Sequence, residues 1–408
     1  MRIKFNRAAL RLFPASADAS SAGGPTTVAR MTFPFDTLRR WPDVEAPELL
    51  AADAADRLLL DESAGARAAL DDGALVVIGD THGALTLASA AEGARRIRVH
   101  QDPLTGERAL AANAERLAVD DDAFSSLPFD ADLVRDAEVV LLRLPRSLDE
   151  LDDVAALIAR HASRGVTVFA GGRIKHMTVA MNDVLRRHFD VVDVTHARQK
   201  SRVLVARGPK DGHDPEPRSA THDSLVVCAY GGVFAGTSVD IGTRFLLDNL
   251  SGRVAGGGTA DDPVVDMACG TGVVAATFAR QGLHAYASDQ SAAAVASARA
   301  TAAANGVSDL VRVERDDLLS LLDDASVSFI ALNPPFHVGA AVYEGVAARL
   351  FADAARVLRP GGELWTVWNS ALLYRPALER VVGPTRQIAR NSKFTVMASV
   401  RSASAYDR

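Results

Sequence analysis

The chain has little cysteine and no long apolar run, and both absences narrow the class of protein. Only two of its 408 residues are cysteines, Cys228 and Cys269, which excludes a disulfide framework and predicts a reducing, cytoplasmic location. No uninterrupted apolar stretch reaches the length of a membrane span, so no membrane association is expected. The beginning of the chain also lacks the apolar core of a secretory signal. We expect residues 1–32 to form a disordered tail or to precede the true start of translation.

The excess of basic residues that is typical of nucleic-acid binders is also missing. The chain carries 45 basic and 51 acidic residues, which gives a net charge of −6. This balance counts only weakly against an RNA target, because a local basic face does not show in a sum. A hydrophobic content of 48% and a charged content of 24% are ordinary for a globular protein, and the length predicts two or three domains.

Strand and helix signals alternate after a polar, turn-rich stretch at residues 208–217, which predicts a linker over 208–222. The alternation predicts an α/β domain with a doubly wound sheet over residues 223–408. The expected strands are 264–268, 284–289, 311–316, 327–333 and 362–369, and the expected helices are 272–280, 291–305 and 343–358. Two further runs, 386–391 and 393–402, predict an antiparallel pair at the sheet edge.

The first half of the chain repeats this layout at a constant offset. Residues 76–83 stand 189 positions before residues 265–272, and residues 139–145 stand the same 189 positions before 328–334. The shared offset indicates an ancient duplication, in which residues 33–207 form a first copy. That copy has lost its chemistry, because Leu144 takes the place of Asn333. The alternative is a pair of unrelated α/β domains.

A glycine loop, Asp266-Met267-Ala268-Cys269-Gly270-Thr271-Gly272, joins a predicted strand to a predicted helix. Such a loop brings backbone amides and a helix N-terminus close to a ligand, and its glycines remove side chains from the approach. Loops for dinucleotides carry a third glycine for the pyrophosphate, whereas here Asp266 precedes the loop and repels phosphate. The pattern therefore favours a ligand with a cationic end, such as S-adenosylmethionine (SAM), with Ala268, Gly270 and Gly272 along its path.

Acidic residues at the next two strand ends extend the predicted cofactor site. Asp289 can accept both hydroxyls of a ribose, and its alternative role is to cap the helix that follows. Asp316 or Asp317, after the third strand, could accept the adenine amine, and the sequence leaves open which of them does so.

The run Asn333-Pro334-Pro335-Phe336 ends a predicted buried strand. The Asn333 side-chain oxygen and the Pro334 carbonyl can accept the two N–H bonds of a planar amine, which directs the nitrogen lone pair at a sulfonium methyl group. Phe336 offers a stacking surface to the base that carries the amine, and Pro335 and His337 are further candidate substrate contacts. This chemistry needs no metal and no covalent intermediate. The alternative interpretation of Asn-Pro is a plain turn.

These motifs resemble the bacterial ribosomal RNA guanine-N2 methyltransferases of the RsmC/RlmG type. The resemblance rests on Asn333–His337 with Gly339, on Gly232-Val233-Phe234, on Asp240 with Gly242-Thr243-Arg244, and on Lys393-Phe394 with Val396. In the first half, Leu38 with Arg40-Trp41-Pro42 and residues 51–60 look like the large-subunit branch. Gly172 with Lys175-His176-Met177, and Lys200-Ser201-Arg202, look like the first domain of the family. The resemblance spans roughly residues 36–402.

The resemblance implies two tandem class I methyltransferase (Rossmann-like) domains. The first would be degenerate and would assist folding and RNA binding, and the second would be catalytic with a seven-stranded mixed sheet. It also implies SAM as cofactor and the N2 amine of a ribosomal RNA guanine as acceptor. Carried over by position, Asp266, Gly270 and Asp289 would hold SAM. Asn333 would hold guanine and would also contact SAM. Arg244 would lie on the segment that covers the pocket.

Four basic side chains of the first half, Lys175, Arg198, Lys200 and Arg202, are expected to contact phosphates. Their alternative role is an ordinary solvated charged face. The expected partner is ribosomal RNA or a ribosomal subunit, and we expect a monomer.

Other functions stay open at this point. The Asn-Pro-Pro motif also serves methylation of adenine in nucleic acid and of a glutamine amide in release factors, although residues 75–208 do not look like the small helical domain of the glutamine enzymes. A catalytically silent RNA-binding or assembly protein is the alternative from another class. The intact glycine loop and Asn333 favour an enzyme.

Overall fold

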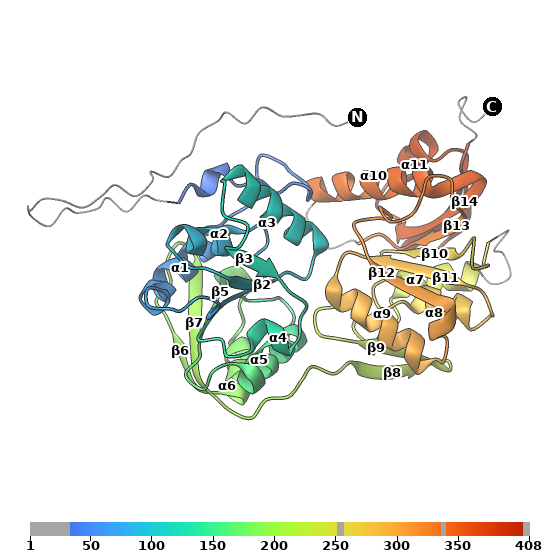
Figure 1. The fold of residues 1–408 in the computed structure, drawn as a ribbon. Helices are drawn as coiled ribbons and strands as arrows, with labels where there is room; N and C mark the ends of the chain where they lie inside the picture. The colour runs from blue at the N-terminus through green and yellow to red at the C-terminus, as the bar shows by residue number, and fades with distance from the viewer. Residues whose placement is uncertain (1–32, 251–256, 336–339, 403–408) are drawn as a thin grey trace, which may run out of the picture.

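The computed structural model describes residues 33–250, 257–335 and 340–402 (Figure 1). It contains two α/β units, each built on a seven-stranded sheet with helices on both faces. The strand orders are β3-β2-β1-β4-β5-β7-β6 in the first unit and β12-β11-β10-β13-β14-β16-β15 in the second. The same order occurs twice, which confirms the prediction of two tandem domains with a mixed seven-stranded sheet, while their origin by duplication stays a prediction. The predicted tail, 1–32, lies outside the described residues.

In the first unit, only β7 runs against its neighbours. The strands are β1 (Leu75–Ile78), β2 (Ile97–His100), β3 (Phe124–Ser126), β4 (Val139–Arg143), β5 (Thr167–Arg173), β6 (Phe189–Val194) and β7 (Ser201–Pro209). The helices are α1 (Ala54–Arg67), α2 (Ala84–Ala91), α3 (Leu104–Arg116), α4 (Ala131–Val134), α5 (Leu148–His161) and α6 (Val179–His188), with 3-10 turns η1 (Phe35–Thr37) and η2 (Ile174–His176). Alternate residues of β1 enter the two cores that cover the sheet.

The second unit has the same plan. Its strands are β10 (Val264–Met267), β11 (Ala285–Asp289), β12 (Val311–Arg315), β13 (Val327–Leu332), β14 (Leu358–Asn369), β15 (Thr385–Arg390) and β16 (Phe394–Val400). Its helices are α7 (Ile241–Leu250), α8 (Val273–Ala279), α9 (Ala292–Ala304), α10 (Ala340–Val357) and α11 (Arg375–Val381), with the 3-10 turn η3 (Ser308–Leu310). The predicted antiparallel pair is confirmed, with β16 between β14 and the edge strand β15.

The segment expected to be a linker, 208–222, is partly regular structure. It includes the end of β7 and all of β8 (Arg218–His222), which forms a two-stranded hairpin with β9 (Leu225–Ala229). The residues of β8 alternate between exposed and half-buried. This strand therefore has no apolar run, and its polar composition conceals it in the sequence.

Helix α9 holds this hairpin in place through a row of polar side chains. Ser297, Thr301 and Asn305 are spaced four residues apart, so they share one face of the helix. The backbone amides of Tyr230, Cys228 and Val226 donate hydrogen bonds to Ser297, Thr301 and Asn305 respectively, and each of these bonds is 3.0 Å long. The amides of Val226 and Cys228 in β9, and that of Tyr230 after it, thereby have hydrogen-bond partners without a further strand.

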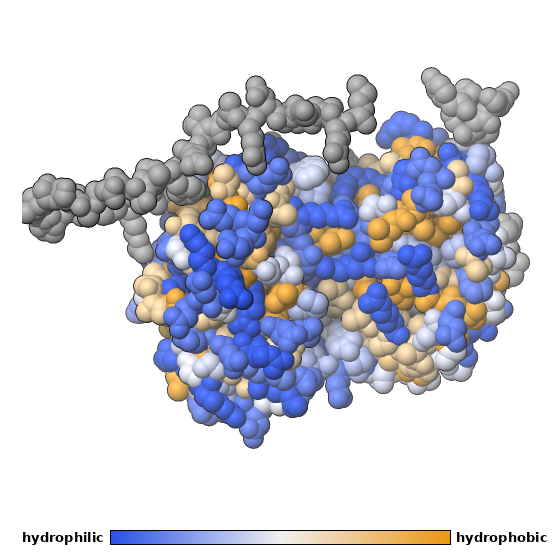
Figure 2. All heavy atoms as spheres, in the orientation of Figure 1, coloured by the Kyte–Doolittle hydropathy of each residue, from blue (hydrophilic) through white to orange (hydrophobic). Residues whose placement is uncertain are grey.

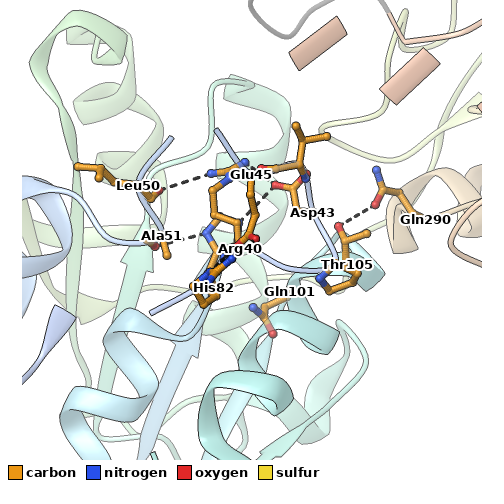
Figure 3. Close-up of polar contacts among 12 residues, drawn as sticks. Arg40, Asp43, Glu45, Leu50, Ala51, His82, Gln101, Thr105 and Gln290 are labelled. Atoms are coloured by element: carbon orange, nitrogen blue, oxygen red, sulfur yellow. Dashed lines mark hydrogen bonds and ion pairs between the residues drawn. The ribbon is translucent and has the colours of Figure 1, made fainter. Parts of the chain in front are cut away.

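The segment before α1 covers the strand ends of the first sheet. The Arg39 backbone exchanges two hydrogen bonds with the Asn113 side chain, of 2.9 and 2.8 Å. Arg40 contacts Asp43 at 2.5 Å and the Val44 carbonyl at 2.7 Å, and His82 lies close to Asp43 (Figure 3).

None of the described helices is both long enough and apolar enough to cross a membrane. On the face seen in Figure 2, hydrophilic side chains cover both units and the apolar ones form separate small groups.

Gly171 provides a test of how α1 packs on the first sheet. A Cβ at this position of β5 would lie 2.5 Å from Leu59 Cγ, and Leu59 is fully buried. We expect Gly171→Ala to destabilise the chain by about 1–3 kcal/mol in urea unfolding, because the interior cannot take up the added methyl group.

The matched control is Gly65→Ala within α1, where a Cβ meets nothing within 4 Å. That variant should gain about 0.5–1 kcal/mol from helix propensity. Leu59→Ala should cost less in the Gly171→Ala background than in the wild type, and strictly additive effects would disprove the contact.

Candidate active site

Asn333 follows the central strand β13, next to the loop that follows β10. Its Nδ2 donates to Asp240 Oδ2 at 3.1 Å and to Thr243 Oγ1 at 2.9 Å. A carboxylate can only accept, so this contact fixes which way the amide faces. The opposite atom, Asn333 Oδ1, is buried and has no hydrogen-bond donor among the residues that the structure describes. Asn333 Oδ1 is therefore a hydrogen-bond acceptor of fixed orientation that can bind a donor from a ligand.

Asp240 holds the amide because it is itself held by a helix. The same oxygen, Oδ2, accepts the backbone amides of Gly242 at 2.8 Å and Thr243 at 3.1 Å at the start of α7. These contacts make Asp240 the cap of α7 and the orienting partner of Asn333 at once. Arg244, one residue further, is exposed and forms no ion pair within the described ranges. The family motif predicted that this segment covers the pocket, but it did not predict the hydrogen bond between Asp240 and Asn333.

The residues beside Asn333 are only partly described. Pro334 is buried and Pro335 is exposed. Phe336 and His337, predicted to contact the base, lie outside the described residues.

The two glycines of the loop have different roles. Gly270 has φ +53° and a Cβ there would meet nothing within 4 Å, so this backbone faces open space. Gly272 has φ +71°, and a Cβ there would lie 2.8 Å from the Ala298 Cβ of α9. Gly270 thus leaves room for a ligand, whereas Gly272 allows two helices to pack closely. Ala268 also adopts a left-handed conformation, with φ +57°.

Asp266 lies beneath the loop rather than beside it. Its side chain is buried, and Oδ2 accepts the amide of Ala275 in α8 at 3.0 Å. Burial raises the pKa of Asp266 to about 8. The side chain is therefore largely protonated at neutral pH, and the repulsion of phosphate that the sequence suggested is weaker than a free carboxylate would give.

Asp289 spans the gap between the loop and α9. Its Oδ2 accepts the amide of Gly270 at 3.0 Å, and its Oδ1 accepts the amide of Ser291 at 2.9 Å. Burial raises the pKa of this carboxyl, and the charge of Asp102 adds to the shift. Each carboxylate oxygen keeps a second lone pair, so Asp289 can accept hydroxyl donors while it holds the loop. The predicted capping role and the predicted ligand role are therefore compatible.

Asp316 and Asp317 both have partners in the structure. Asp316 is buried and accepts the amide of Leu321 at 2.8 Å and the hydroxyl of Ser320. Asp317 pairs with Arg349 of α10 at 3.1 Å and with Arg108 of α3 at 3.3 Å. The adenine contact stays a prediction for either residue.

Comparisons with known proteins agree with this arrangement. The family model described as RLMG N-terminal domain matches residues 27–210, and the Methyltransferase small domain model matches residues 224–398. The Streptomyces avermitilis protein named ribosomal RNA large subunit methyltransferase G is 34% identical over 388 residues, covering 91% of this chain and 99% of its own. The chain belongs to the ribosomal RNA large subunit methyltransferase G family. It is thus a methyltransferase, from a family of SAM-dependent enzymes, as the sequence predicted.

Further relatives and a solved structure extend the likeness to both units. The Magnetococcus marinus protein of the same name is 31% identical over 372 residues, covering 90% of this chain and 97% of its own. The structure of the T. thermophilus 16S rRNA N2 methyltransferase RsmC, in complex with AdoMet and guanosine, has a TM-score of 0.69 at 22% identity. It covers 86% of this chain and 92% of its own, which confirms the predicted methyltransferase fold.

The first unit of this methyltransferase holds its equivalent loop, residues 77–83, by hydrogen bonds within the unit. Asp80 accepts the amides of Gly83 at 3.1 Å and Thr86 at 2.8 Å, and Gln101 donates to the Asp80 carbonyl. A Cβ on Gly83 would lie 2.8 Å from Leu110 of α3. Gly83 corresponds to Gly272, where an added Cβ would also lie 2.8 Å from a helix, so this glycine packs in the same way in both units. The two loops differ at Thr81, which stands where the second unit has Gly270.

The four basic residues predicted to bind phosphate differ in their surroundings. Lys175 and Lys200 are exposed and form no ion pair among the described residues. Arg198 pairs with Asp61 at 3.1 Å and with Glu62 at 3.5 Å. Arg202 is half-buried.

The ends of β5 and β7 bring these basic residues together, because Arg173 pairs with Ser201 in the ladder and Ile174 N donates to the Lys200 carbonyl at 3.0 Å. The sequence reasoning missed Arg146 and Arg173. Burial lowers the pKa of His176, and the charges of Arg146, Lys175 and Arg173 lower it further. These side chains therefore create a locally positive surface despite the acidic net charge.

The raised pKa of Asp266 predicts a pH dependence of stability. Its carboxyl titrates near 8 in the folded chain and near 3.8 in the unfolded chain, so the folded state binds the extra proton between these values. The free energy of unfolding should therefore fall as pH rises from about 4 to 8 and then level off.

Asp266→Asn keeps an oxygen for Ala275 but cannot ionise. We expect it to flatten this slope and to be more stable than the wild type at pH 8 by several kcal/mol in denaturant unfolding, at about 1.4 kcal/mol for each pH unit between the two pKa values. The exposed Asp323→Asn is the control and should retain the wild-type slope. Equal slopes for the wild type and Asp266→Asn would contradict the assignment.

Proposed function

We propose that this chain transfers a methyl group from SAM to the N2 amine of a guanine in ribosomal RNA. The observation that carries the proposal is the buried Oδ1 of Asn333, which has no donor within the described residues. Rotating the Asn333 side-chain amide by a half turn would place Oδ1 against the carboxylate of Asp240, and two acceptors cannot form a hydrogen bond. An acceptor fixed in this way suits an N–H donor on a flat substrate group.

The residues around the loop suit SAM as the cofactor. Gly270 leaves open space above the backbone, and Asp289 keeps free lone pairs for ribose hydroxyls. When bound, SAM would supply an electrophilic methyl group on a sulfonium. We assign Asp289, Gly270 and Ala268 to the cofactor side of the site, and Asp316 or Asp317 to the adenine end.

Asn333 and its neighbours would then position the acceptor amine. Asn333 Oδ1 takes one N–H of the amine, and the Pro334 carbonyl takes the other. Two acceptors hold the nitrogen with its lone pair directed toward the cofactor, so positioning supplies much of the rate, roughly 7–11 kcal/mol in well-oriented pairs. The two acceptors also stabilise the positive charge that develops on the nitrogen.

Guanine in ribosomal RNA is favoured over the other planar amines by family membership. The relatives are named as large-subunit ribosomal RNA methyltransferases, and the T. thermophilus enzyme with the same fold is named as an N2 enzyme and was solved with guanosine. No observation favours adenine or a glutamine amide. A ribosomal RNA substrate implies action in the cytoplasm, and we expect the enzyme to act as a monomer.

Replacing Asn333 tests the proposal directly. We expect Asn333→Ala to lower kcat by about 10²–10³-fold, the loss typical of removing one fixed hydrogen-bonding group in the transition state. SAM affinity from isothermal titration should change much less than kcat, because the contacts assigned to Gly270 and Asp289 are retained. Asn305→Ala is the control, since that asparagine binds Val226 on the far side of α9. Wild-type turnover by Asn333→Ala would refute the mechanism.

The substrate side of the same experiment uses RNA in which inosine replaces the modified guanine. Inosine lacks only the 2-amino group, so methyl transfer from labelled SAM should stop. Mass spectrometry of digested RNA should identify N2-methylguanosine in the unmodified substrate. Continued methylation of the inosine RNA would place the reaction on another atom.

We also propose that the first domain, residues 33–207, binds RNA through the basic surface formed by Lys175, Lys200, Arg202, Arg146 and Arg173. Each phosphate contact should add about 0.7–0.9 to the slope of log K against log salt. The Lys175→Ala/Lys200→Ala variant should therefore lower the slope by roughly 1.4–1.8 in RNA-binding titrations. Arg198→Ala should change it less, because Arg198 is already paired with Asp61 and Glu62. An unaltered slope in the double variant would exclude these lysines.

A further inference from the structure

The two copies of the fold meet through equivalent loops. The loop between β2 and α3 lies against the loop between β11 and α9, and Asp102 stands 189 positions before Ser291. Leu104 N donates to the Gln290 carbonyl at 2.9 Å, and Ala292 N donates to the Asp102 carbonyl at 3.0 Å. The same loop in each copy thus pairs with its counterpart, as in the self-complementary interface of a twofold dimer.

Side chains reinforce this contact from both domains. Thr105 Oγ1 donates to Gln290 Oε1 at 2.8 Å, and Figure 3 shows this bond crossing from the first domain to the second. Arg315, at the end of β12, donates to the carbonyls of Gln101 at 2.7 Å and Asp102 at 2.9 Å. Its guanidinium also pairs with Glu107 at 2.7 Å.

Asp102 contributes to the start of a helix in the other domain. Its Oδ1 accepts the Ser291 hydroxyl at 3.0 Å and the amide of Ala293 at 2.9 Å. Ser291 Oγ in turn accepts the amide of Ala294 at 3.1 Å. The N-terminus of α9 is therefore capped jointly by its own serine and by an aspartate of the degenerate domain, whose negative charge also suits a helix N-terminus.

This shared cap is directly linked to the candidate SAM contact. Ser291 N donates to Asp289 Oδ1 at 2.9 Å, while Gly270 N holds Asp289 Oδ2 at 3.0 Å. A shift of Ser291 would therefore move one of the two groups that orient the Asp289 carboxylate. Asp102 accepts a hydrogen bond from the hydroxyl of the same Ser291, so it is linked to Asp289 through that residue.

We propose that Asp102 of the degenerate domain is a positioning residue for SAM binding, acting through Ser291 on the Asp289 carboxylate. The inference rests on the proposed SAM site. It gives the first domain a role at the cofactor pocket that is separate from RNA binding. The pocket of the second domain is accordingly incomplete without the loop from the first.

Three substitutions in the full-length chain separate geometry from charge. Asp102→Ala removes the acceptor, and we expect it to raise the Kd for SAM about tenfold in isothermal titration, with kcat at saturating SAM within about twofold of the wild type. Asp102→Asn keeps the single oxygen that accepts both bonds, so it should stay within about threefold of the wild-type Kd. Asp102→Glu keeps the charge but displaces the oxygen, so it should bind SAM as weakly as Asp102→Ala.

Asp130→Ala is the matched control for loss of a helix cap. Asp130 caps α4 of the first domain by accepting the amide of Asp132 at 3.0 Å, and among the described residues it forms no hydrogen bond or ion pair with the second domain. This variant should keep the wild-type Kd even if its melting temperature falls.

The possible outcomes distinguish this inference from the function on which it rests. If the wild type fails to bind SAM, the proposed function is wrong. If the wild type binds SAM and Asp102→Ala and Asp102→Glu bind equally well, Asp102 does not position the site. Should Asp102→Ala fail to fold, the comparison of Asp102→Glu with Asp102→Asn decides, and weaker binding by the asparagine variant than by the glutamate variant overturns the proposal.

Discussion

One carboxylate oxygen determines how the end of β13 is arranged. Asp240 Oδ2 accepts two amides at the start of α7 and the side-chain amide of Asn333. Because a carboxylate offers no donor, Asn333 must turn its own oxygen away from Asp240 and leave it buried without a donor from the described residues. An unmet acceptor of this kind is costly in a protein interior, unless a ligand completes it. The proposed hold on a substrate amine depends on this constraint.

The two units share one fold but differ in the residues of equivalent loops. In the first copy, Thr81 stands where the second copy has Gly270, and Asp80 and Gln101 hold the loop by hydrogen bonds. The same copy presents its β2–α3 loop to the equivalent loop of its partner, where Asp102 and the residues around it meet α9. The same loop position of the repeated fold thus supplies Asp102 in the first unit and the start of α9 in the second.

Much of the second domain could be predicted from periodicity and turn residues. Helix α9 begins after Ser291 and ends before Gly306, because a serine cap and a left-handed glycine are local devices. The β15–β16 pair was predicted from two extended runs with almost nothing between them. Strand β8 was missed, because a hairpin strand with one exposed face has no apolar run. Arg198 was predicted to be free for phosphate, but its acidic partners stand more than 130 positions away in the chain.

The sequence by itself determined most elements of the second domain, the repeated layout and the class of enzyme, because caps, periodicity, a glycine loop and Asn-Pro-Pro are all read within a few residues. Only the tertiary structure decided what each polar group is left free to do. It directed Asn333 Oδ1 away from Asp240, placed Asp266 under the loop with a raised pKa, and brought Asp102 to the helix behind Asp289. These outcomes depend on burial and on contacts between residues far apart in the chain, and neither can be predicted from a local sequence pattern.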